Sequence, residues 1–152
     1  MFRDRSWFPE RSLLLMALLW AIGCGSSGKQ PLAPLTGTVT YKGQPVVGAS
    51  MTFIPENKSY RPAIAITDKQ GRYRMETYEP GDGAGVGPGK ISLSLRGPAK
   101  KIPPGVGDAV LEQMADVGDP LIPLKYFKPE TSGLEYEVKP NTRNVFDIIL
   151  QD

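Results

Sequence analysis

The strongest constraint on this fold is a repeated period of two. Six short segments place an apolar residue at every second position, and a seventh, 62–67, is more uniformly apolar. Val39 and Tyr41, for example, alternate with threonines. Alternation of this kind is typical of a β-strand with one buried face. The pattern predicts strands at 38–41, 50–53, 62–67, 72–76, 90–95, 134–139 and 146–150.

Turn-forming residues separate these segments. The linking stretches 42–45, 55–57, 68–71 and 81–89 supply Gly, Pro, Asn or Asp, which favour chain reversal through unusual φ values or side-chain caps. The chain has 152 residues, including 17 Gly and 15 Pro, and this composition suits one domain rich in turns. We therefore expect an all-β fold, a seven-stranded antiparallel β-sandwich.

One insertion, residues 97–133, interrupts the regular alternation of predicted strands and turns. Within it, Asp108 can cap a short helix that places Val110, Leu111 and Met114 on one side and stops at Gly118. Long insertions often carry function. The alternative is that this one covers an open end or edge of the fold.

The N-terminus has the layout of a secretory signal peptide. Arg3, Arg5 and Arg11 precede the uncharged stretch 13–22, which ends at the small residue Gly23. Ten residues of helix rise about 15 Å, roughly half the hydrocarbon core of a bilayer, which disfavours a spanning helix. We expect a signal peptide at 1–23, a flexible tether at 24–34 and the folded domain at 35–152.

Cys24 is the only cysteine, and the chain has no histidine, so a disulfide or a zinc site has no obvious partner. The sequence Ala21-Ile22-Gly23-Cys24 resembles the lipobox of bacterial lipoproteins, although that family prefers Leu where Ala21 stands. The resemblance implies a diacylglycerol on the Cys24 thiol, a second acylation on its amine, and a chain exported and held at the outer membrane or the periplasmic face. The alternative is an ordinary signal peptide with a free thiol nearby.

A second resemblance covers residues 35–150. The segments LTGTVTYKGQPVVGASMTFIP and TDKQGRYRM resemble the carboxypeptidase-regulatory-like, or transthyretin-like, sandwich, and the whole stretch is similar to small bacterial lipoproteins built on it. This resemblance implies a non-catalytic accessory module.

Other residue patterns give little support to catalysis or to a bound cofactor. The run GDGAGVGPGKI lacks the phosphate-loop spacing, because Ala84 stands where Gly is needed and Ile91 where Ser or Thr is needed. Asp68 offers calcium a single carboxylate inside a turn. Without histidine the commonest general base is missing. We expect no enzyme, no cofactor and no metal site, and the near-balanced charge of residues 24–152 gives no footprint for nucleic acid.

Two functional hypotheses remain. The first is a structural or protein-interaction module of the cell envelope, binding a protein through an exposed edge strand or the insertion. The second is a carbohydrate-binding accessory domain that contacts an envelope polysaccharide through the aromatic residues not assigned to inward strand positions. Those candidates are Tyr60, Tyr78, Tyr126 and Phe127. Tyr126 and Phe127 have an alternative interpretation as anchors that hold a loop against the core.

Overall fold

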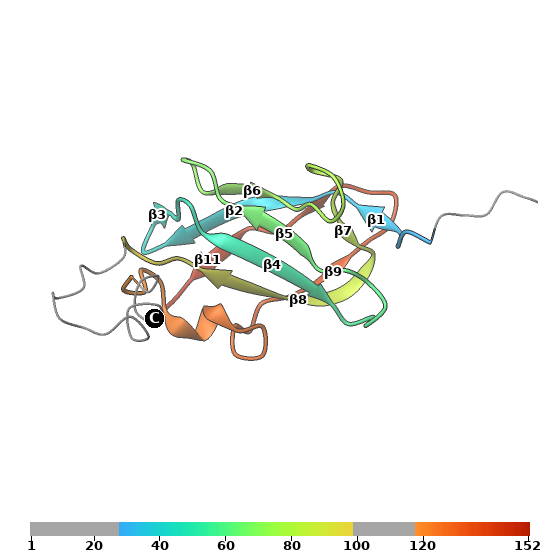
Figure 1. Cartoon of the computed structure of the whole chain (residues 1–152). Coiled ribbons are helices and arrows are strands. Elements are labelled where there is room, and N and C mark those ends of the chain that lie inside the picture. Colours follow the sequence, from blue (N-terminus) through green and yellow to red (C-terminus); the bar gives the residue numbers. More distant parts are fainter. Residues whose placement is uncertain (1–27, 99–117) are drawn as a thin grey trace, which may run out of the picture.

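The computed structural model describes residues 28–98 and 118–152, and this part of the chain is essentially all-β (Figure 1). Its helical content is one short 3-10 turn, η1. In chain order the elements are β1 (Leu32–Ala33), β2 (Leu35–Tyr41), β3 (Gln44–Pro45), β4 (Ser50–Pro55), β5 (Ala63–Ile66), β6 (Arg72–Arg74), β7 (Ala84–Gly85), β8 (Gly87–Ser94), η1 (Leu124–Phe127), β9 (Glu135–Val138), β10 (Asn144–Val145) and β11 (Ile148–Leu150).

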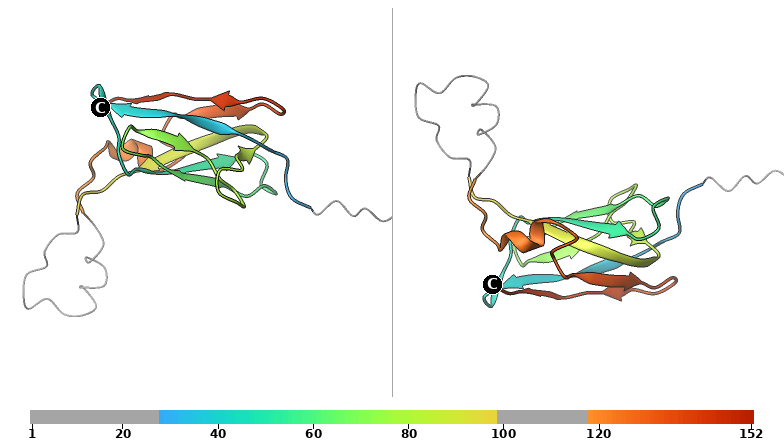
Figure 2. Two further views of the ribbon diagram at one scale, coloured as in Figure 1. Left: turned by 90° about the horizontal axis from the view of Figure 1, so that it is seen from above. Right: turned by 90° about the horizontal axis from the view of Figure 1, so that it is seen from below.

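Two larger sheets lie face to face, as the two views of Figure 2 show. One has the strand order β5-β4-β8-β9, and all of its pairs are antiparallel. The other is centred on β2, which pairs with β6 and β3 on one side and with β10 and β11 on the other. A small antiparallel pair, β1 with β7, joins the start of the described chain to the loop before β8.

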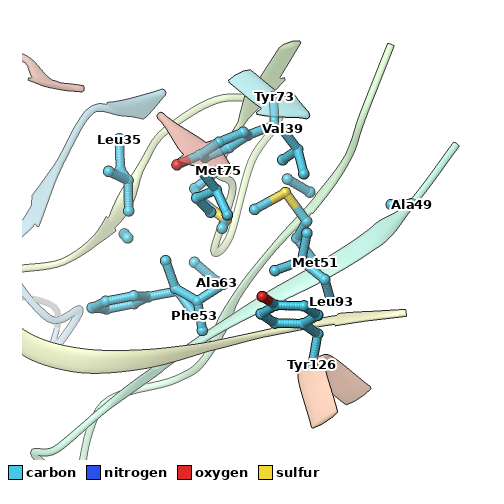
Figure 3. Close-up of a cluster of buried hydrophobic side chains, with 14 of the residues drawn as sticks. Leu35, Val39, Ala49, Met51, Phe53, Ala63, Tyr73, Met75, Leu93 and Tyr126 are labelled. Carbon is cyan, nitrogen blue, oxygen red and sulfur yellow. The ribbon is translucent and has the colours of Figure 1, made fainter. Parts of the chain in front are cut away.

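The core fills the space between the two larger sheets. Figure 3 shows Met51 and Phe53 from one sheet pointing toward Leu35 and Val39 from the other, and all four side chains are at most 1% exposed. Burying a side chain of this size contributes about 1.5–3 kcal/mol. The core therefore ties the sheets together through the residues at alternate positions of their central strands.

The sequence prediction of an all-β fold is confirmed, and each of the seven predicted segments coincides with a strand. These strands are β2, β4, β5, β6, β8, β9 and β11. The details differ from a seven-stranded antiparallel arrangement in two respects. The described residues also form β1, β3, β7 and β10, and both β10 and β11 run parallel to β2. A period of two identifies the buried face of a strand and carries no information about its direction, so the parallel pairs could not be predicted from it.

The predicted tether at 24–34 is wrong over its second half. Gln30 is 8% exposed and Ala33 is 1% exposed, and β1 is hydrogen-bonded to β7. The side-chain amide of Gln30 donates to the carbonyl of Arg61 at 3.0 Å and accepts the Arg61 N–H. The fixed part of the chain therefore begins at Gln30, because a short polar segment is held by hydrogen bonds that its composition does not reveal.

The predicted helix from Asp108 to Gly118 lies almost entirely outside the described residues. The flanks of the insertion are described, and they form a ladder. Gly97 donates its N–H to the carbonyl of Asp119 at 2.9 Å, and Leu121 donates to the carbonyl of Leu95 at 3.0 Å. This pairing, which includes an antiparallel bridge between Arg96 and Pro120, is called the neck of the insertion below.

A carbonyl interrupts the ladder between β2 and the last two strands. In a regular parallel pair the Thr38 N–H would bond the Phe146 carbonyl. Instead the Tyr73 hydroxyl donates to that carbonyl at 2.7 Å, and the Asp147 carboxylate accepts the Thr38 N–H at 2.8 Å. A Cβ at Gly37 would lie 2.0 Å from the Phe146 carbonyl oxygen. Only glycine therefore allows this carbonyl to pass over β2 and reach Tyr73.

We predict that Gly37→Ala lowers the free energy of unfolding by about 2 kcal/mol, the cost typical of forcing an added methyl into a packed site. Gly28→Ala serves as the control, because a Cβ there meets no atom within 4 Å. Urea unfolding followed by circular dichroism measures both variants. Equal stabilities for the two would contradict the assigned role of Gly37.

Candidate functional site

The hairpin formed by β5 and β6 is closed at both ends and open in the middle. At one end Ile64 and Glu76 exchange two backbone hydrogen bonds, of 2.8 and 2.9 Å. At the other end Asp68 donates its N–H to the carbonyl of Arg72 at 2.9 Å. Ile66 and Arg74 occupy the position between these pairs, and no backbone hydrogen bond joins them in the described chain.

Sheet membership explains the opening. β5 is an edge strand of one large sheet and β6 is an edge strand of the other, so the two strands diverge where the sheets separate. In an antiparallel ladder every second residue directs its N–H and C=O toward the same neighbour. The backbone groups of Ile66 and Arg74 are therefore directed into the gap, since those of Ile64 and Glu76 already face each other across it.

A groove follows this gap. Its first hollow has a volume of about 470 Å³, and a second of about 220 Å³ lies beyond the Ile64–Glu76 bridge. Ile64 is 54% exposed and Ile66 is 71% exposed, so the lining offers exposed apolar surface beside two exposed arginines. We call both hollows together the seam groove; its lining is Ile64, Ala65, Ile66, Asp68, Arg72, Tyr73, Arg74, Glu76, Thr77, Tyr78, Glu79 and Pro80.

Two charged side chains of the seam groove, Asp68 and Arg72, interact with each other in the turn between β5 and β6. Burial raises the pKa of Asp68, but hydrogen bonds from Arg72 and Gln70 outweigh this effect and hold the pKa below its usual value. The Arg72 guanidinium also forms an ion pair with the Asp68 carboxylate at 2.8 Å. Arg74 donates its Nε–H to the carbonyl of Gly81 at 3.0 Å and forms no ion pair with a carboxylate of the described residues. A cationic side chain is thus available beside the open backbone position.

The far end of the seam groove is shaped by one carboxylate. Asp82 accepts the backbone N–H groups of Thr77, Tyr78 and Glu79 at 2.6, 2.9 and 3.1 Å. Desolvation raises the pKa of Asp82, and these three donors outweigh desolvation so that the pKa lies below its usual value. The glycine-rich run therefore supplies a turn built around a carboxylate, and this turn positions Tyr78.

The four aromatic residues predicted to contact a ligand do not lie together. Tyr78 lines the seam groove, with the Lys29 ammonium 5.3 Å and the Arg61 guanidinium 5.4 Å from its ring centroid. Tyr60 precedes Arg61 in the same loop and lies beside Gly85.

Tyr126 and Phe127 lie toward the opposite end of the molecule, on η1. Tyr126 is 5% exposed, and its hydroxyl donates to the Gln151 carbonyl at 3.2 Å and accepts the Gln151 N–H at 2.9 Å. This burial fits the alternative interpretation of Tyr126, an anchor that holds a loop against the core, and it leaves little of the ring open to a ligand. Phe127 is half-buried, with the Arg96 guanidinium 5.0 Å from its ring centroid.

Cys24, the predicted lipid attachment residue, lies outside the described residues. In the described ranges, 28–98 and 118–152, no group of three or more Cys, His, Asp or Glu side chains is placed to hold a metal ion. The same ranges contain no helix with the length and apolarity required to cross a bilayer.

Comparison of the chain with protein-family models, with curated proteins and with solved structures found no match.

The sequence analysis did not predict the seam groove. Its only signal was segment 62–67, where isoleucines occupy the positions that a strand with one buried face would give to polar residues.

The turn at Asp82 gives a prediction about pH. A carboxylate with a lowered pKa in the folded state stabilises the protein above its unfolded pKa, near 3.8, and this contribution is lost as the pH falls through the folded value. Asp82→Asn should lower the free energy of unfolding at pH 7 by about 1 kcal/mol, a modest value because the side chain is only partly buried and solvent screens its charge.

The difference between wild type and Asp82→Asn should shrink as the pH falls through the lowered pKa of Asp82, because the wild-type side chain itself becomes neutral there. Urea unfolding between pH 2 and pH 7 measures it. Glu137→Gln, at an exposed residue of β9, is the control and should show no such trend. A difference that stays constant over this pH range would argue against a charged Asp82 as the organiser of the turn.

Proposed function

We propose that this chain is a lipid-anchored, non-catalytic lipoprotein of a bacterial cell envelope, in which a transthyretin-like sandwich binds an extended segment of a partner protein at the seam groove. The single observation that carries the binding role is the open position at Ile66 and Arg74 between two closed ends of one hairpin. Unpaired backbone groups of strands can bond the main chain of an extended peptide, and here they are available at one position of each strand.

The chemistry of the seam groove specifies the kind of segment. Backbone groups directed into the gap can bond the main chain of an extended peptide, whatever its sequence. Ile64 and Ile66 supply exposed apolar surface for one side chain, and Arg74 supplies a cation for an acidic one. We therefore infer a partner segment that pairs an apolar residue with a nearby Asp or Glu.

The non-catalytic part of the proposal is supported by how the carboxylates are used. Asp68 and Asp82, the acidic residues of the two turns beside the seam groove, accept backbone N–H groups and hold these turns in place. Their lowered pKa values keep them ionised at neutral pH, whereas a general acid needs a raised pKa. Their geometry thus fits a structural role.

The carbohydrate-binding alternative has less support. A sugar stacks on an open aromatic face, and the Tyr78 ring already has two cationic side chains close to its centroid. Tyr126 is buried, and Phe127 lies apart from Tyr60 and Tyr78, so no platform of several rings is formed by the four candidates.

The partner site predicts different effects for two equally exposed isoleucines. Ile66 and Ile149 are both 71% exposed, but only Ile66 lines the seam groove. A photoreactive residue at position 66 should cross-link a partner in intact cells, and mass spectrometry then defines the cross-linked segment. A synthetic peptide of that segment should bind Ile66→Ser at least fivefold more weakly than wild type and bind Ile149→Ser normally. Equal weakening by both substitutions would remove the seam groove as the site.

The anchor predicts a simple labelling result. The wild-type chain should incorporate radiolabelled palmitate and sediment with the membrane fraction, because two or more acyl chains hold a protein stably in a bilayer. Cys24→Ser should incorporate no label and remain in the soluble fraction, whereas Ser26→Ala should behave as wild type. Sedimentation of Cys24→Ser at the wild-type level would contradict lipid anchoring.

A further inference from the structure

The segment that links the proposed anchor, Cys24, to the fixed part of the domain is shorter than the sequence predicts. Gln30 is buried and bonded through its side chain to the backbone of Arg61, so the fixed part of the domain begins there. Five residues separate Gln30 from Cys24. Fully extended, the chain between them reaches at most about 22 Å. A tether running to residue 34 would have allowed much more freedom.

This reach decides which end of the molecule can approach the bilayer. β2 contains seven residues, which span about 23 Å, and it runs from the end that carries β1 toward the opposite end (Figure 1). The turn at 42–43 extends beyond β2. The tether is therefore too short for an inverted orientation, in which the end with η1, the neck and the C-terminus would rest on the membrane and Gln30 would lie at the far side of the domain.

Three loops lie at the end that carries β1 (Figure 1). We call this end the anchor end, and its loops are residues 56–62, 77–83 and 139–143. Together with Lys29 these loops carry five basic side chains and three acidic ones. One of the three acids, Asp82, is turned toward backbone N–H groups. The basic side chains are all exposed; they are Lys29, Lys58, Arg61, Lys139 and Arg143.

Two features of the anchor end suit a lipid headgroup layer. Exposed basic side chains within a Debye length of an anionic leaflet are attracted to it. Tyrosine favours the boundary between apolar and aqueous phases, and Tyr60 and Tyr78 are both half-exposed at this end. Charge and aromatic content therefore agree with the direction that the short tether imposes.

We propose that the anchor end docks on the anionic headgroups of the bilayer that holds the acylated Cys24, so that the sheets stand upright with the neck turned away from the membrane. This orientation rests on the proposed lipid anchor. It adds a second contact surface, made of protein side chains and phospholipid headgroups. It leaves the first hollow of the seam groove, between β5 and β6, open along the side of the upright domain.

The test uses the isotope-labelled mature chain on nanodiscs of phosphatidylethanolamine and phosphatidylglycerol, with a fraction of nitroxide-labelled headgroups. Paramagnetic broadening of amide signals then reports proximity to the lipid surface. We expect broadening at least threefold stronger in loop 56–62 than in turn 67–71. Residues 52 and 149 report the two outer sheet faces and should show intermediate values.

Matched charge reversals test the headgroup contact. Lys58 lies in the anchor end and Lys69 lies in the turn at the opposite end, and both side chains are exposed. Lys58→Glu, or replacement of phosphatidylglycerol by phosphatidylcholine, should reduce the broadening of loop 56–62. Lys69→Glu should leave it unchanged. Equal sensitivity to both substitutions, or to neither, would overturn docking on anionic lipid.

Failure of the anchor and failure of the orientation give different results. If the exported chain carries no acyl groups, the anchor proposal fails, and coupling Cys24 to a maleimide lipid restores a tether of the same length for the broadening experiment. Broadening that is uniform over both ends, or strongest at residue 52 or 149, would overturn the upright orientation under either form of attachment.

Discussion

The hydrogen bond from Tyr73 to the Phe146 carbonyl holds three strands in one arrangement. The carbonyl passes over Gly37 of β2, the hydroxyl comes from β6, and Phe146 joins β10 to β11. Burial, together with the nearby Asp147 carboxylate, raises the pKa of Tyr73 far above its usual value, so the hydroxyl remains a donor at any physiological pH. The position of β6, and hence one wall of the seam groove, depends on this contact.

The same arrangement explains why the hairpin opens. β6 is held to β2 by the ladder and by Tyr73, while β5 is held to β4 along four paired residues. Each strand thus follows its own sheet, and the turn at Asp68 joins them only at the tip. An unpaired position on both strands is the result, and it costs little in the folded state because backbone groups at an exposed edge remain accessible to water.

Sequence patterns predicted the parts of this fold that depend on the alternation of apolar residues. The buried positions of β4 and β8 follow from that alternation, as does the all-β class. Features that depend on contacts between distant residues were missed. Gln30 is polar and precedes a proline, yet the backbone of Arg61 holds it in place. The assignment of Tyr126 stayed open because an aromatic side chain beside a loop looks the same in sequence whether its hydroxyl meets water or the backbone of Gln151.

The neck also determines where this domain can accept changes in chain length and sequence. Because Leu95 and Gly97 are bonded to Leu121 and Asp119, the two points where the insertion leaves and rejoins the fold are already side by side. Doubling the length of a segment between fixed ends costs only about 0.6 kcal/mol in closure entropy. The insertion can therefore gain, lose or exchange residues over evolutionary time without disturbing either sheet, which makes this site a natural place for related chains to diversify.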